Sequence, residues 1–350
     1  VLLSGQTKTS VRTHQGFQVD LRVLEERRWG TALQYFTGSQ SHNIRLREVA
    51  LSHGFSLSEY ALRREDGSEL LCATEEQLYA ALGLPYIPPE LREDRGEIEA
   101  AKSGRLPNLV TVEDLRGDLH VHTTASDGRN SLGEMAGAAQ ARGLEYIAVA
   151  DHTHSLGVVR GTTVDDLLAQ RIEIDALNER FGRRFRVLAC AEVEVLADGS
   201  LDFPDDVLAQ LDVAVAAVHL GLRQSREQYT GRVLAAIRNP HVDIIAHPTG
   251  RLLGEREPAD VDMEAVFQAA AETGTALEVN AHPKRLDLRD IHVRRAIELG
   301  VKIAIDSDAH HVDGFDVLPF GVGTARRGWA TAADVINTWP LKELIEWTAR

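Results

Sequence analysis

The chain has 350 residues, of which 43% are hydrophobic and 26% charged, and this composition is typical of a soluble globular protein with two or three domains. No run approaches the roughly 18 to 20 apolar residues of a membrane span, and the first residues lack the apolar core of a signal peptide. The two cysteines, Cys72 and Cys190, are far apart in the sequence, which excludes a zinc finger and favours a reducing, cytoplasmic location.

The net charge of −15 argues on average against a polyanionic partner, because nucleic acids attract clustered Lys and Arg. The charge is uneven, however, since residues 1–50 are net basic and residues 111–350 are net acidic. Divalent cations bound to the acidic part would return positive charge to it. Net charge therefore leaves the substrate class open.

Residues 1–23 predict two extended runs joined by a turn near His14. Because a domain rarely begins in the middle of a sheet with an uncovered edge, we expect the chain to be the C-terminal part of a longer protein. Helical spacing follows at residues 40–53 and again at residues 75–82. Residues 95–112 belong to a stretch rich in proline and charge, which indicates a linker at a domain boundary.

From Gly117 onward, short apolar runs alternate with amphipathic segments of helical periodicity. This alternation favours right-handed βαβ units with buried parallel strands, and a series of such units suits a closed barrel better than an open sheet. The expected strands are residues 117–121, 146–150, 187–193, 212–218, 242–246, 276–280 and 301–306. The expected helices lie within residues 132–143, 163–181, 228–239, 262–274 and 289–300.

Histidines and carboxylates recur where these apolar runs end, as in GDLHVH, YIAVADH and IAIDSDAH. The strand ends of a parallel barrel converge, so side chains from separate segments would meet there. A single buried histidine is more often a hydrogen-bonded core residue than a ligand, but so many polar groups on one barrel face are costly to bury unless something binds them. The candidate metal ligands are His120, His122, Asp127, His152, Glu192, His219, His247, Asp308 and His310.

Mixed nitrogen and oxygen ligands without thiolate suit Mn²⁺, Zn²⁺ or Fe²⁺. Clustered divalent ions lower the pKa of water and neutralise phosphoryl oxygens, and phosphoester hydrolysis requires both effects. The sequence contains no GxxxxGKS/T phosphate-binding loop, and no Ser-His-Asp order or activated cysteine that would supply a competing nucleophile. These residues indicate metal-assisted hydrolysis of a phosphoester.

The segments DLHVHTTASDG, AVADHT, CAEVEV, AVHL, IAHPTGRLLG and IDSDAHH together resemble the polymerase and histidinol phosphatase (PHP) superfamily, over residues 113–350. The resemblance implies an α/β fold, a distorted (β/α)7 barrel that holds three divalent metals, Mn²⁺ or Zn²⁺. It implies catalytic roles for Glu192 and Asp308, and contact between Arg251 and the substrate phosphate. The implied ligand sets are His120, His122, Glu192 and Asp308 for the first metal, Glu192, His219 and His247 for the second, and Asp127, His152 and His310 for the third.

The N-terminal segments GFQVDLRV and LQYFTGSQSHNIRLREVALSHGFSLSEYAL resemble the palm end and the thumb of a family X DNA polymerase. Judged by its pattern alone, Asp20 is equally well an ordinary exposed strand residue, and YFTG a packed aromatic turn. The resemblance implies a palm end at residues 1–30, a small α+β thumb at residues 31–94, and a metal-binding, catalytic role for Asp20. It also implies nucleotide-binding roles for Tyr35, Phe36, Gly38 and Asn43.

A family X thumb joined to a PHP barrel is similar to the bacterial family X polymerases of base-excision repair. This similarity implies a monomer that binds gapped or primer-template DNA, with a metal-dependent 3′-5′ exonuclease in the barrel, and AP endonuclease or 3′-phosphatase as further activities. Asp20 alone cannot hold the two Mg²⁺ or Mn²⁺ ions of nucleotidyl transfer, so nucleotide addition from dNTPs requires the other palm carboxylates of the full-length protein. Two alternatives remain: a free-standing phosphatase of small phosphomonoesters, similar to histidinol phosphatase, and a metal-stabilised barrel without turnover.

Overall fold

The computed structural model describes residues 1–157 and 160–349. The chain divides into two compact units, Val1–Leu106 and Pro107–Arg350, which we call the N-terminal unit and the barrel unit. Within the described residues, no helix combines the length and the hydropathy of a membrane span.

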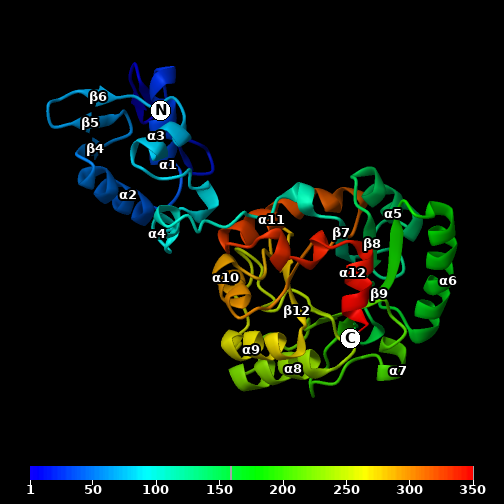
Figure 1. Cartoon of the computed structure of the whole chain (residues 1–350). Helices are drawn as coiled ribbons and strands as arrows, with labels where there is room; N and C mark the ends of the chain where they lie inside the picture. The colour runs from blue at the N-terminus through cyan, green and yellow to red at the C-terminus, as the bar shows by residue number, and fades with distance from the viewer. Residues whose placement is uncertain (158–159, 350) are drawn as a thin grey trace. The chain divides into compact units, whose positions relative to one another are not determined.

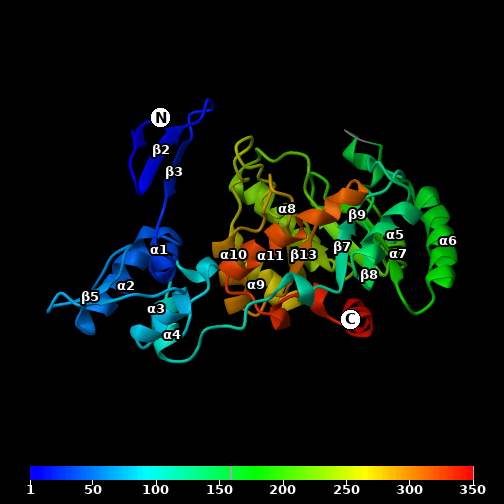
Figure 2. The ribbon, with the colours of Figure 1, turned by 90° about the horizontal axis from the view of Figure 1, so that it is seen from above.

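The N-terminal unit begins with an antiparallel sheet of three strands, β1 (Leu3–Ser4), β2 (Lys8–Arg12) and β3 (Gln18–Arg22). The two expected extended runs are confirmed as β2 and β3, and the turn between them uses Gly16 at φ +91°. Figure 2 shows this hairpin projecting from the helices of its unit. Most of its side chains are exposed, so the apolar ones are uncovered within the described residues.

Helices and a second small sheet form the core of the N-terminal unit. The expected helices are confirmed, and each begins at a hydroxyl cap: Ser39 accepts a hydrogen bond from the His42 backbone nitrogen (3.1 Å), and Thr74 accepts one from Gln77 (3.4 Å). Gly30 allows α1 to approach the residue before α3, because a Cβ there would lie 2.1 Å from the Thr74 backbone. The elements are α1 (Trp29–Phe36), α2 (Gln40–Ser52), β4 (Phe55–Leu57), β5 (Leu62–Arg64), β6 (Glu69–Leu70) and α3 (Glu75–Ala81).

The expected linker is extended only in part, because residues 97–102 form α4 (Glu97–Lys102). The Glu97 carboxylate is fully buried and accepts hydrogen bonds from His42 Nδ1 (2.6 Å) and from the Arg95 backbone nitrogen (2.7 Å). Helix α4 was not predicted, although the boundary between the two units, at Leu106 and Pro107, falls within residues 95–112. The charged residues of α4 are of a type usually exposed to solvent, but the N-terminal unit supplies His42 as a buried partner for Glu97.

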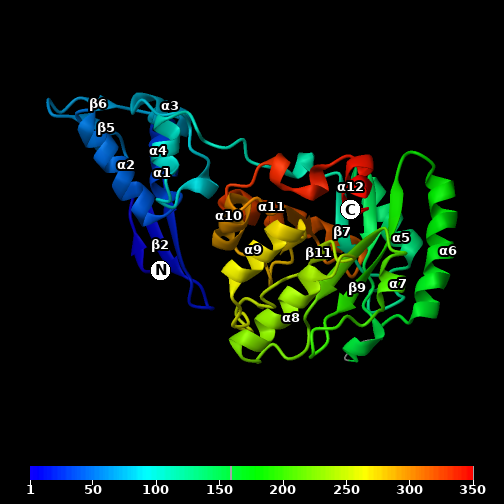
Figure 3. The same ribbon diagram turned by 60° about the horizontal axis from the view of Figure 1, so that its bottom comes forward.

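The barrel unit contains seven parallel strands, hydrogen-bonded side by side in sequence order from β7 to β13 (Figures 1 and 3). Its two edges approach each other, since Val121 forms a parallel bridge with Ala309, and the His122 backbone nitrogen donates to the Ala309 oxygen at 2.9 Å. The predicted α/β barrel is confirmed as a nearly closed one. The strands are β7 (Gly117–Val121), β8 (Tyr146–Val149), β9 (Arg186–Glu194), β10 (Val213–Ala217), β11 (Ile244–Ile245), β12 (Ala276–Asn280) and β13 (Ile303–Asp306).

Helices follow the strands and lie around the sheet, with α8 and α9 side by side (Figure 1). The α-helices are α5 (Leu132–Ala141), α6 (Val164–Phe181), α7 (Asp205–Leu208), α8 (Arg226–Arg238), α9 (Met263–Thr273), α10 (Asp290–Glu298), α11 (Leu318–Arg327) and α12 (Leu341–Thr348). Short 3₁₀ turns occur at Glu26–Arg28, Pro89–Leu91, Val112–Asp114, His154–Leu156, Val312–Val317, Ala332–Asp334 and Ile336–Thr338.

One core cluster takes buried side chains from every barrel strand, among them Leu119, Cys190 and Val215, and so fills the barrel interior. The C-terminal segment packs into the same cluster through Ile336 and Leu344. This segment closes the barrel at the end where the strands begin. The carboxyl ends of the strands are left to form a site.

Candidate metal centre

All nine predicted side chains gather at the carboxyl ends of the barrel strands. Seven of them line a cavity of about 400 Å³. The other two, His120 and His122, are fully buried and contact Glu192 and Asp308 beside this cavity. The predicted convergence of strand ends is therefore found in the structure, while the role of each residue stays a prediction.

Glu192, on β9, lies at the centre of the cluster and is buried. Its Oε2 is 2.7 Å from His152 Nδ1 and 3.4 Å from His120 Nε2. Its Oε1 is 2.9 Å from His247 Nε2 and 3.2 Å from His219 Nε2. One carboxylate thus faces an imidazole on β7 and three imidazoles that follow β8, β10 and β11.

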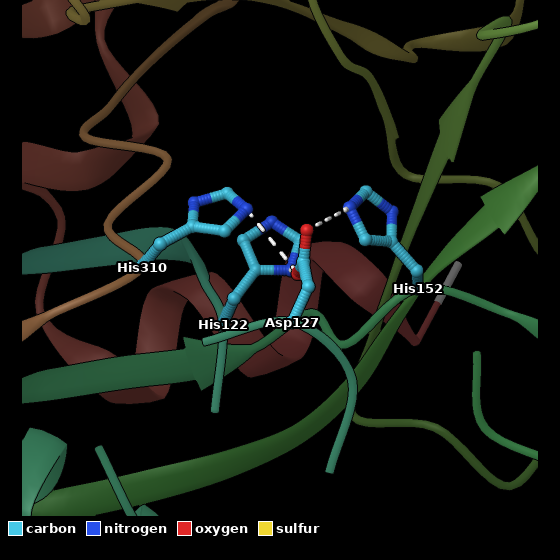
Figure 4. Close-up of side chains that lie close together, drawn as sticks. All are labelled: His122, Asp127, His152 and His310. Atoms are coloured by element: carbon cyan, nitrogen blue, oxygen red, sulfur yellow. Dashed lines mark ion pairs between the residues drawn. The ribbon is translucent and has the colours of Figure 1, made fainter. Parts of the chain in front are cut away.

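A second group surrounds Asp127, in the loop after β7. Figure 4 shows His122, His152 and His310 turned toward this carboxylate. Their nearest ring nitrogens lie 3.9 Å, 3.7 Å and 3.3 Å from it, in that order. Asp308 Oδ1 lies 3.1 Å from His122 Nε2, so the groups share a histidine.

The spacing of ligand atoms divides the residues differently from the predicted sets. His122 joins Asp127, His152 and His310 in one group whose ligand atoms lie within 4.8 Å of one another, and it also joins His120 and Asp308. A further group consists of His152, Glu192 and His219. His122 and His152 each belong to two groups, as expected for ligands of neighbouring metal ions in one pocket.

Many ligand atoms in the centre are buried without a hydrogen-bond partner, as far as the described residues go. A buried polar atom left unpaired costs about 1–3 kcal/mol, so the cluster is unfavourable as it stands. Divalent cations would bind one nitrogen of each neutral ring and the carboxylate oxygens, and this combination of ligands suits Mn²⁺ or Zn²⁺. The atoms that form no hydrogen bond of acceptable geometry, even where they lie close together as His152 Nδ1 and Glu192 Oε2 do, include His120 Nε2, both ring nitrogens of His122, His152 Nδ1, Glu192 Oε2, His219 Nε2 and His247 Nδ1.

The imidazoles differ strongly in their tendency to bind a proton. Burial opposes protonation of His219, but Glu192 outweighs it and raises the pKa to about 9. Burial lowers the pKa of His247 to about 3, and the charge of Arg285 adds to the effect. Protons alone therefore cannot compensate the buried carboxylates evenly, and cations bound to neutral rings can.

Two carboxylates that the sequence analysis did not select hold the ligands in place. Glu278, on β12, accepts a hydrogen bond from His120 Nδ1 and another from the His247 backbone nitrogen, both at 2.6 Å. Glu194 accepts one from His219 Nδ1 at 2.7 Å. Such partners fix the tautomer and orientation of a ligating ring. The available signal was their position at or within two residues of an apolar strand end.

The backbone is strained at two of the ligands. His247 has φ +28° and Asp308 has φ +55°, a region that residues with a Cβ rarely adopt. Strain of this kind costs about 1–3 kcal/mol and is typical of functional sites. It aims both side chains into the cavity immediately after β11 and β13.

The expected contact between Arg251 and a phosphate in this cavity is not supported. Arg251 Nε donates to the Arg285 backbone oxygen at 2.8 Å, and its guanidinium also donates to the Leu286 oxygen, which directs it away from the metal ligands. Arg256 and Arg285 line the cavity instead. Arg251 is held by the loop around Leu286 outside this cavity, and its contact with a substrate phosphate stays a prediction.

Asp20 of the N-terminal unit lines a different cavity, of about 350 Å³, together with Arg22, Trp29 and Phe36. A hydrogen bond from Ser10, with further ones from Gln18 and Lys8, lowers the pKa of Asp20 to about 2. The carboxylate is therefore charged and faces a cavity, as a metal-binding residue must.

The remaining YFTG residues do not line that cavity. The Tyr35 backbone oxygen accepts a hydrogen bond from Asn43 Nδ2 at 2.9 Å, so these two residues join α1 to α2. Gly38 has φ +92°, and a Cβ there would lie 2.6 Å from Arg92 Cβ. This close packing is enough to require glycine at position 38, so the presence of glycine there does not by itself indicate a nucleotide-binding role.

Comparisons with known proteins agree with both units. Residues 32–93 match the family model of the DNA polymerase beta thumb. Over 347 residues, 98% of this chain, the sequence is 42% identical to the DNA polymerase/3′-5′ exonuclease PolX of Bacillus subtilis (strain 168), and it spans 60% of that protein's length. A probable phosphatase of Thermoanaerobacter sp. (strain X514) is 30% identical over 215 residues, which are 58% of this chain and 81% of the phosphatase.

Among solved structures, the histidinol phosphate phosphatase of Lactococcus lactis subsp. lactis Il1403, complexed with zinc, L-histidinol and phosphate, matches 62% of this chain and 95% of its own, with a TM-score of 0.47 and 16% identity. Along nearly its whole length the chain is therefore similar to a bacterial family X DNA polymerase, and its N-terminal unit contains a thumb of the DNA polymerase beta type.

Proposed function

We propose that the barrel unit is a metal-dependent 3′-5′ exonuclease within a family X polymerase of base-excision repair. The observation that carries this proposal is the set of buried, unpaired ligand atoms at the carboxyl ends of the barrel strands. The name of the Bacillus subtilis relative, which includes both polymerase and exonuclease, supports DNA as the substrate.

Three divalent cations, Mn²⁺ or Zn²⁺, would be held by the nine side chains. Glu192 would bridge two of them, because four imidazoles lie within 3.4 Å of its oxygens. Such ions, when bound, lower the pKa of water and neutralise charge on a phosphoryl group.

The chain's own side chains would position the substrate. Arg256 and Arg285 line the cavity and would bind the nonbridging oxygens of the scissile phosphate. Arg285 Nε also lies 3.5 Å from Asp308 Oδ2, which fixes its guanidinium beside the ligands. Leu156 and Val218 supply apolar wall on which the terminal nucleoside would pack and from which water would be excluded.

The proposal extends to the N-terminal unit, divided into a palm end at residues 1–30 and a thumb at residues 31–94. Asp20 would bind one Mg²⁺ or Mn²⁺ of the polymerase centre, and Phe36 would face the incoming dNTP, since both line one cavity. The full-length protein would act on gapped or primer-template DNA as a cytoplasmic monomer, in keeping with its two free cysteines. AP endonuclease and 3′-phosphatase activities are proposed as secondary reactions of the barrel.

The variant Asp308→Asn tests the exonuclease. Asn tolerates a positive φ better than Ala does, so the backbone at +55° is kept while a negatively charged ligand is lost. We expect release of nucleotides from a labelled 3′ end, in chain reconstituted with Mn²⁺, to fall about 100-fold or more. A metal titration of the stripped wild-type chain should find close to three ions per chain.

The matched control is Asp313→Asn, an exposed carboxylate on the same segment. It should keep wild-type activity. Equal 3′-end release by the Asp308 variant and the wild type would contradict the proposed centre, as would a wild-type chain that binds one ion or none.

A second candidate function is hydrolysis of small phosphomonoesters, because the match to probable phosphatases covers 81% of the Thermoanaerobacter protein. The two candidates separate in one assay of the wild-type chain. The exonuclease proposal requires a higher kcat/KM on a primer-template than on histidinol phosphate, and the reverse ranking would favour the phosphatase.

A further inference from the structure

A second, smaller cavity of about 210 Å³ lies in the barrel unit, and its walls carry three arginines. Arg251 and Arg256 belong to the loop after β11, and Arg289 precedes α10. Both walls are therefore loops at the carboxyl ends of strands. Leu252 and Arg256 line this cavity and the metal cavity alike, so the two are adjacent.

Carboxylates balance the charge of these arginines only in part and from a distance: Asp287 and Asp290 act on Arg251, and Asp287 and Glu255 act on Arg256. Among the residues that the structure describes, none of the three forms an ion pair with a carboxylate, whereas the neighbouring Arg285 pairs with Asp308 at 3.5 Å. Glu257 is the single carboxylate that lines the cavity. Positive charge is therefore in excess, as in a binding site for an anion.

The guanidinium groups of two of these arginines are held in place before any ligand arrives. Arg251 Nε donates to the Arg285 backbone oxygen, and Arg256 Nε donates to the Gly250 oxygen, each at 2.8 Å. Burial lowers the pKa of both side chains; neighbouring guanidinium groups add to this effect and the Asp287 carboxylate opposes it. An anion would relieve this repulsion, and arginine is the side chain best suited to bind phosphate oxygens.

His292 adds a neutral donor to the same cavity. Its Nδ1 is buried and has no hydrogen-bond partner within the described residues, and burial with nearby arginines lowers the pKa of the ring to about 4. A neutral imidazole can donate one hydrogen bond to an oxyanion. The cavity thus combines unpaired positive charge with an unused polar atom.

We infer that this arginine cavity binds a second backbone phosphate of the substrate strand, next to the phosphodiester at the metal centre. The inference rests on the proposed exonuclease function and names the subsite that would hold the penultimate nucleotide. Adjacent cavities with a shared arginine match two linked phosphates. A small phosphomonoester would fill only one of them.

Binding of short thymidine oligonucleotides to the full chain tests this inference. We compare TpT with TpTpT, both with phosphorothioate linkages that block cleavage, by competition in fluorescence anisotropy with Mn²⁺ present. The wild-type chain should bind TpTpT more tightly than TpT. Arg289→Ala should weaken TpTpT binding about three- to tenfold, reduce its salt dependence by about one ion, and leave TpT unchanged.

Arg289 suits this test because it is exposed and its side chain does not cap α10, so its removal should leave the fold intact. Arg289→Lys should recover part of the affinity. The matched control is Arg183→Ala, an exposed arginine before the start of β9, at the opposite end of the strands, which should behave as wild type.

Equal TpTpT affinity in Arg289→Ala and wild type would overturn the inference. A second competitor, inorganic phosphate, is measured with the same variant. If Arg289→Ala weakened binding of inorganic phosphate but kept the preference for TpTpT, the inference would also be overturned, because the cavity would then be a site for free phosphate. The measurement involves no turnover, so failure of the wild-type chain to degrade DNA would contradict the exonuclease without affecting this result.

Discussion

Two imidazoles of the metal centre, those of His120 and His219, have one nitrogen hydrogen-bonded to a carboxylate outside the predicted ligand set, and this partner determines how the ring is held. For His120 the partner is Glu278, which also fixes the backbone of His247. A charged acceptor raises the basicity of the ligating nitrogen and excludes the wrong tautomer. We therefore expect Glu278→Gln to lower metal affinity about 10- to 100-fold, measured by competition with a chromophoric chelator.

A suitable control for this substitution is Glu272→Gln, on the exposed side of α9, which should bind metal like the wild type. Circular dichroism would show that both variants keep the barrel. Unchanged metal affinity in the Glu278 variant would mean that the hydrogen bond to His120 has no influence on ligation.

The ligands themselves could be predicted because the end of a parallel strand is visible in the sequence as an apolar run that stops at a polar residue. Glu278 follows the same rule at the end of the run 276–280, but a single glutamate without a neighbouring histidine carries little signal. Arg285 could not be predicted, because a loop brings it to the cavity from five residues beyond the end of β12. The same loop occupies the guanidinium of Arg251.

At the scale of elements, α4 is held to the N-terminal unit by the buried Glu97 carboxylate. Burial alone would raise the pKa of Glu97, but hydrogen bonds from His42 and from the backbone nitrogens of residues 94, 95 and 97 keep it below the ordinary value of 4.5. The resulting stabilisation is complete above pH 4.5 and is lost as the pH falls through the lower pKa of the folded state.

We expect Glu97→Gln to destabilise this unit at pH 7 by about 2–3 kcal/mol, because charge-assisted hydrogen bonds are lost. The difference from wild type should shrink as the pH falls below 4.5. Hydrogen exchange of peptides from α2 and α4 in the full chain measures it, with the exposed Glu99→Gln as control. Equal protection of Glu97→Gln and wild type at pH 7 would refute the role of this carboxylate.

The elements of the barrel were more predictable than those of the N-terminal unit. Strands β7 and β12 have the expected bounds, because their apolar residues are buried on both faces. Helix α4 was missed because six residues, half of them charged, show no clear apolar face until Ile98 and Ala101 are seen packed inside the unit. Short helices gain their stability from tertiary contacts, which a sequence does not display.

For the whole molecule, we expect removal of metal ions to destabilise the barrel unit and to leave the N-terminal unit unchanged. Asp127, Glu192 and Asp308 converge in one pocket, so removal of cations leaves like charges together. A ligand at 100 times its dissociation constant stabilises a fold by about 2.7 kcal/mol, which corresponds to about 5–10 °C for a barrel of this size. Calorimetry with and without a chelator should show this shift in the barrel transition.

The N-terminal unit provides the internal control, since chelation should leave hydrogen exchange in α2 unchanged. A shift of both units, or of neither, would count against cations as part of the barrel's stability.

The bridge between Val121 and Ala309 has a consequence for the protein's synthesis. Strands β7 and β13 stand at opposite ends of the barrel sequence, yet His120 and Asp308 must meet beside that bridge. A nascent chain folds from its N-terminus, so the thumb is made while the hydrolytic centre is still in pieces. The candidate metal centre is therefore completed only after β13 and the residues that follow it have been synthesised.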